Sequence, residues 1–119
     1  MSKQPTWNSE HVSASLEEQG YSVEPISRDT QLAAQVEGYE YSHCFVVRKN
    51  DYEAMLCLHQ YEDNEAGIRA GSAVASWPLD VSLYRRTVVN GRVLAEIVSQ
   101  QQQSSYVDKL YEDVLSIVI

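Results

Sequence analysis

A β-hairpin followed by an amphipathic helix is the strongest local pattern in this chain. Asn90 and Gly91 separate two runs rich in apolar and β-branched residues, and Asn-Gly tolerates the two positive φ values of a type I′ turn. A two-residue loop there fixes the register and predicts that Arg85 faces Glu96 across the hairpin. One face of the hairpin is then apolar and belongs to the core, and it consists of Tyr84, Val88, Val93 and Ile97.

The helix after the hairpin is predicted from Ser105, because Ser105 and Asp108 resemble a capping box. Apolar residues follow at helical spacing, while polar residues such as Asp113 are expected to face outward. The chain ends on apolar residues, so we expect the core or a partner to cover this end. The apolar face consists of Val107, Leu110, Tyr111, Val114, Leu115 and Val118.

The rest of the chain alternates between helical and strand patterns. Expected helices cover 9–19, a short turn after Asp29, and 64–76, and expected strands cover 21–24, 41–48 and 52–61. Together with the last hairpin and helix, this order predicts an α+β domain over 9–119. We expect an antiparallel sheet of about five strands with helices packed on it, after a flexible leader over 1–8.

Charge and length limit the classes of function. A chain of 119 residues forms one domain, and its net charge of −8 repels nucleic-acid backbones and anionic membranes. No apolar run approaches the roughly 20 residues that span a bilayer, and residues 1–8 lack the pattern of a signal peptide. These features predict a cytoplasmic protein that binds neither nucleic acid nor membrane.

No pattern predicts catalysis, a metal or a cofactor. Two cysteines are too few for a disulfide framework, so Cys44 and Cys57 are expected to be buried small hydrophobes. If Asn50-Asp51 is a two-residue turn, the cysteines face each other and His59 lies on the same face. Three converging ligands fall short of a usual structural zinc site.

Two groups of residues are candidate binding surfaces. The only basic cluster lies on the last hairpin, beside the apolar helix, and is either a solvated rim or part of an interface. The candidate interface consists of Arg85, Arg86, Arg92, Tyr111, Leu115 and Val118. Several of the eight tyrosines flank the first hairpin and either bound the core or line a groove. The candidate pocket consists of Tyr41, Tyr52, Met55 and Tyr61.

Three segments also carry a resemblance. They are residues 16–24 (LEEQGYSVE), the central strand pair ending at Tyr61, and the hairpin and helix from Tyr84 to Leu115. Their order resembles the type III secretion chaperone fold and the related YbjN-like family. The resemblance implies a homodimer that binds another protein and has no enzymatic activity.

We therefore expect a non-catalytic protein-binding or chaperone-like module that acts as a homodimer. A stripe of small residues on the middle helix favours close approach of a neighbour and consists of Gly67, Ala70, Gly71 and Val74. One alternative is a small-ligand-binding protein with a pocket between sheet and helices. Another is an orphan open reading frame of the kind that mobile elements carry.

Overall fold

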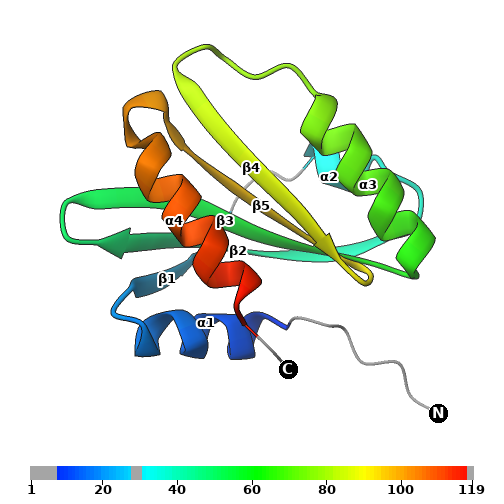
Figure 1. The fold of residues 1–119 in the computed structure, drawn as a ribbon. Helices are drawn as coiled ribbons and strands as arrows, with labels where there is room; N and C mark the ends of the chain where they lie inside the picture. Colours follow the sequence, from blue (N-terminus) through cyan, green and yellow to red (C-terminus); the bar gives the residue numbers. More distant parts are fainter. Residues whose placement is uncertain (1–7, 28–30, 118–119) are drawn as a thin grey trace.

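A five-stranded antiparallel sheet in the order β1-β2-β3-β5-β4 organises the chain (Figure 1). The structure is a computed structural model and describes residues 8–27 and 31–117. The strands are β1 (Ser22–Ile26), β2 (Tyr39–Lys49), β3 (Tyr52–Tyr61), β4 (Leu83–Asn90) and β5 (Val93–Gln100). The helices are α1 (Ser9–Glu18), α2 (Gln31–Ala34), α3 (Asn64–Ser76) and α4 (Ser104–Leu115), with a 3₁₀ turn, η1 (Gln101–Gln103), before α4. The predicted α+β fold is confirmed. The predicted leader falls outside the described residues except for Asn8.

Helices pack on both faces of the sheet. On the first face, α1 and α4 cover the larger core cluster, where Leu16 of α1 and Leu110 of α4 meet Leu56 and Ile97 of the sheet. On the second face, α3 and α2 cover a smaller cluster around Tyr61. The hairpin residues Tyr84, Val88, Val93 and Ile97 all belong to or pack against the first-face cluster, as predicted.

The first hairpin has the register expected for a two-residue turn. Lys49 pairs with Tyr52 around Asn50 and Asp51, and Asn50 adopts a φ of 58°. Asparagine tolerates this left-handed conformation better than most residues do. Cys44 therefore lies opposite Cys57, as this turn predicts.

The predicted register of the second hairpin is wrong. Asn90 pairs with Val93, so the turn residues are Gly91 and Arg92, and Gly91 has a φ of 66°. Glycine at the first central position is the arrangement of a type II′ turn. The pairing moves by two positions, which leaves every side chain on its predicted face but gives Arg85 a different partner, Val98.

Two predicted roles on α4 are also wrong. The N-cap of the helix is Gln103, which makes no side-chain capping bond, so the expected capping box does not form. Asp108 instead accepts hydrogen bonds from Tyr84 and Arg86. Asp113 is buried rather than outward-facing. Burial raises the pKa of the Asp113 carboxyl, but hydrogen bonds from Lys109 and Tyr21 outweigh this effect and hold it below its usual value.

The small-residue stripe of α3 packs within the chain. A Cβ atom added to Gly67 would lie 2.9 Å from the carbonyl oxygen of Gly91, and one added to Gly71 would overlap the Val89 side chain. Figure 1 shows α3 beside the tip of the β4–β5 hairpin. The stripe thus serves a contact inside the fold and does not support an interface with another chain.

Candidate functional site

The helices cover only part of the second face of the sheet. Leu32 of α2 and Val74 of α3 pack near Tyr61, Leu94 and Val89, at one end of the strands. Further along the same face, adjacent strands place three apolar residues side by side in one row. These are Val46, Met55 and Val98. Among the described residues, neither core cluster includes this row.

A hollow of about 340 Å³ lies over that row. Its apolar floor, which we call the open groove, consists of Ile26, Val46, Met55, Leu83 and Val98. Polar side chains, including Ser99 and Gln100, stand at its border. An apolar floor with a few polar groups at the edge is typical of a surface that binds another molecule.

A second hollow of about 180 Å³ adjoins the open groove, because Leu83 and Val98 line both. We call it the His59 cleft. Its walls come from α2 and from the loop between α3 and β4, and its polar side chains are His59, Arg85 and Glu96. The two hollows together extend along the second face.

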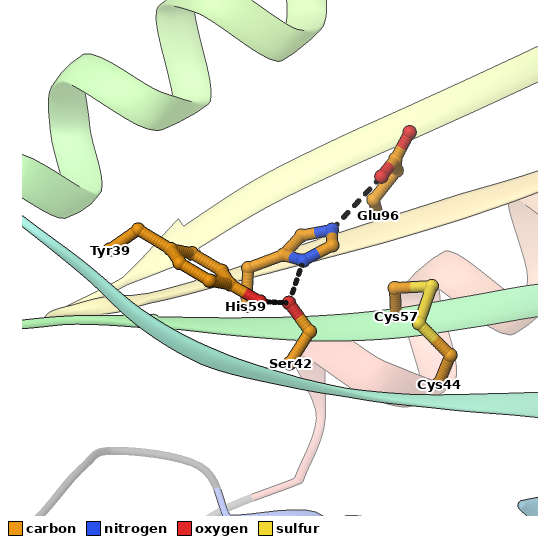
Figure 2. The surroundings of a disulfide bond; sticks show 6 residues. All are labelled: Tyr39, Ser42, Cys44, Cys57, His59 and Glu96. Carbon is orange, nitrogen blue, oxygen red and sulfur yellow. Dashed lines mark hydrogen bonds and ion pairs between the residues drawn. A yellow bond between two sulfur atoms is a disulfide. The ribbon is translucent and has the colours of Figure 1, made fainter. Parts of the chain in front are cut away.

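Four polar side chains form a hydrogen-bonded network beside the His59 cleft (Figure 2). Tyr39 Oη lies 2.8 Å from Ser42 Oγ, which lies 2.6 Å from His59 Nδ1. His59 Nε2 lies 3.0 Å from Glu96 Oε1, and the His59 side chain is only 1% exposed. The His59 position on β3 pairs with Leu94 of β5, so Glu96, two residues on, reaches the imidazole diagonally.

Serine, histidine and glutamate in this order are the components of a hydrolytic triad. Ser42, however, lies within a regular strand rather than at a strained turn, and the His59 cleft is lined by His59 and Glu96 but not by Ser42. The side chains of the network instead satisfy one another's hydrogen bonds beneath the second face. We interpret them as a structural polar network.

Cys44 of β2 and Cys57 of β3 form a disulfide (Figure 2). Cys57 lies between Met55 and His59 on the same face of β3. The predicted burial of the two cysteines is confirmed, whereas the expectation of two unlinked thiols is wrong. The reason is the hairpin register, which places the two residues directly opposite each other. Among the described residues, no three His, Cys, Asp or Glu side chains gather to hold a metal ion.

The candidate interface residues do not form one basic surface. Arg85 lies on the second face and donates to the carbonyl oxygens of Ala75 and Trp77, instead of pairing with Glu96. Arg86 pairs with Asp108 at 2.8 Å and stacks over the ring of Tyr111. Arg92 donates to the carbonyl oxygen of Glu62. Leu115 is exposed, and Val118 lies outside the described residues.

The candidate pocket residues also lie apart. Tyr61 is fully buried and donates to the Ala33 carbonyl oxygen at 2.8 Å, whereas Tyr41 is exposed. Tyr52 stacks on Tyr106, with ring centroids 5.4 Å apart. Met55 lines the open groove. Of the four, only Met55 contributes to the hollows on the second face.

Sequence reasoning missed most of this site. Of the residues in the open groove, only Met55 was a candidate from the sequence, and no sequence pattern indicated that helices leave this face partly open. The incorrect hairpin register assigned Glu96 to Arg85 and so concealed its contact with His59.

The fold and the open groove define an α+β domain in which helices cover the first face of the sheet and only part of the second face. No protein-family model, no curated protein and no solved structure matches the chain. In the part of the chain that the structure describes, there is no helix with the length and apolar character needed to cross a membrane.

Proposed function

We propose that this chain is a non-catalytic protein-binding module that holds an apolar segment of a partner protein in a chaperone-like manner. The observation that carries this role is the open groove, an apolar strip on the sheet over which the helices of the described residues leave a hollow, although Val98 in it is only 8% exposed. Met55 and Val46 remain half-buried there. A partner side chain that fills the hollow removes this apolar area from water, at roughly 25 cal/mol per Å².

Charge indicates the kind of segment. The chain carries −8, so a segment with an apolar centre and basic flanks gains electrostatic attraction as well as apolar contact. The resemblance to type III secretion chaperones, stated from the order of elements, agrees with such a role.

The test is the affinity for a labelled peptide with leucine and valine at its centre and lysine at both ends, measured by fluorescence anisotropy. Met55→Asp places a charge on the floor of the groove and is expected to weaken binding at least about 10-fold. Ile68→Asp is the matched control, because Ile68 is 61% exposed on α3, away from the groove. Equal losses in both variants, or none in Met55→Asp, would refute the role of the groove.

A small apolar ligand is the second candidate, because about 340 Å³ is within the size range of small-molecule pockets. The same titration separates the two. In this titration, 1-octanol competes with the labelled peptide for the groove. If 1-octanol displaces the peptide only at concentrations far above the dissociation constant of the peptide, a protein partner is favoured. If 1-octanol binds more tightly than the peptide, a small ligand is favoured.

We also propose that the chain acts as a homodimer through the exposed side of α4. Leu115 is 46% exposed there and Tyr111 is half-buried. Light scattering is expected to give twice the chain mass for the unaltered protein and a lower mass for Leu115→Asp. A monomer at every concentration tested would end this proposal.

The cytoplasmic location is likewise a proposal, and the Cys44–Cys57 disulfide is the observation against it, because disulfides persist mainly in oxidising compartments. Alkylation of thiols in freshly lysed cells decides it. Two alkylated cysteines support the cytoplasm, and a protected pair supports an oxidising compartment.

A further inference from the structure

A third hollow, of about 430 Å³, is larger than the two on the second face. Residues of the β2–β3 turn, η1 and α4 line it, together with Tyr21, which follows α1. Figure 1 shows the β2–β3 turn and the start of α4 at the same end of the sheet. We call this hollow the tyrosine–lysine pocket, after Tyr21, Lys49, Tyr52, Tyr106 and Lys109. Asn50, Gln102 and Ser105 add polar groups to its wall. It is separate from the open groove except that Gln103 lines both.

Aromatic rings form one part of this pocket. Tyr52 and Tyr106 stack with their planes 20° apart, and Tyr52 remains 49% exposed. Tyr106 is fixed because its hydroxyl donates to the Val47 carbonyl oxygen at 2.7 Å, and burial raises the pKa of Tyr106 to about 12. A rigid ring stack with one exposed member is a platform on which a planar ring packs favourably.

Two ammonium groups form the other part. Lys49 Nζ lies 4.6 Å from the centroid of the Tyr21 ring and donates to the Gln19 carbonyl oxygen. Lys109 Nζ lies 2.8 Å from Asp113 Oδ1. Each ammonium has three N–H donors, so each keeps donors beyond the bond named here. Lys49 and Lys109 are the charged side chains that line the pocket, and both are cationic, in a chain that is otherwise strongly acidic. The carboxylates of Asp113 and Glu112 act on Lys109, and that of Glu53 acts on Tyr106.

From this arrangement we propose that the tyrosine–lysine pocket binds a small aromatic monocarboxylate. The ring packs on Tyr52, and the carboxylate accepts hydrogen bonds from Lys49 and Lys109. A monoanion pairs with the two lysines, whereas a second negative charge would meet the nearby carboxylates of Asp113, Glu112 and Glu53 and the overall field of the chain. This site goes beyond the proposed function and does not depend on the open groove.

The test titrates three probes against the full chain by NMR. We expect 2-naphthoate to bind at least about 10-fold more tightly than 2-naphthylmethanol, which lacks the charge, and than cyclohexanecarboxylate, which lacks the aromatic ring. These comparisons use the unaltered protein and so depend on no variant folding. Equal affinity for 2-naphthoate and either of the other probes would overturn the proposal.

Variants locate the site. Lys49→Met is expected to lower the affinity for 2-naphthoate at least about 5-fold and to leave the affinity for 2-naphthylmethanol unchanged. The matched control is Arg69→Met, which removes an exposed positive charge on α3, outside the pocket. An equal loss in Arg69→Met would show attraction by general charge and would refute the site. Loss of 2-naphthoate binding in Met55→Asp but not in Lys49→Met would place the ligand in the open groove, which also refutes it.

Discussion

Reduction of the Cys44–Cys57 disulfide is expected to lower the free energy of unfolding by about 3 kcal/mol. The two cysteines are 13 positions apart, and cross-linking a loop of this length removes conformational entropy mainly from the unfolded chain. Urea unfolding with and without dithiothreitol measures the difference.

The matched control is the double variant Cys44→Ala with Cys57→Ala. Its stability should not respond to dithiothreitol, whereas that of the unaltered chain should. If mass spectrometry after alkylation shows both thiols free and the urea midpoint is unchanged, the disulfide does not stabilise this hairpin and the expectation is wrong.

Glu96→Leu is expected to lower the free energy of unfolding by about 2 kcal/mol, because it removes the partner of a buried imidazole nitrogen. The His59 side chain is 1% exposed, so its ring nitrogen has little contact with solvent that could replace the lost hydrogen bond. The double variant His59→Leu with Glu96→Leu should recover most of this loss, since replacing both partners by apolar side chains leaves neither unsatisfied.

A double-mutant cycle by urea unfolding separates the two cases. Strong non-additivity is expected, because the two side chains are in direct contact on neighbouring strands. Thr87→Val is a control on β4, at the position opposite Glu96. Additive losses for His59→Leu and Glu96→Leu would contradict the structural role of the pair.

Local sequence patterns predicted the helices and strands well, and the residue pairing between strands less well. Asn8 and Asp63 cap α1 and α3 through their side chains, as their sequence context suggests. Asn90-Gly91 was ambiguous, because glycine fits either central position of a hairpin turn that needs a positive φ. The turn at Gly91-Arg92 keeps the core face and changes the pairing, so the core was predicted correctly and the contacts of Arg85 and Glu96 were not.

The open groove depends on a different kind of information. Met55 and Val46 are apolar residues on central strands, and alternation predicts only that they point to one face. Whether that face is buried depends on how far α2 and α3 extend over it, which depends on the packing of Gly67 and Gly71 against the second hairpin. Such tertiary packing has no periodic signal in a single sequence.

The central claim is that the open groove is the binding surface, and amide NMR shifts on adding the lysine-flanked apolar peptide test it most directly. We expect the largest shifts at Val46, Met55 and Val98, which form one row on the second face, and loss of these shifts in Met55→Asp. Shifts confined to α1, α4 and the first face, with that row unchanged, would contradict the claim.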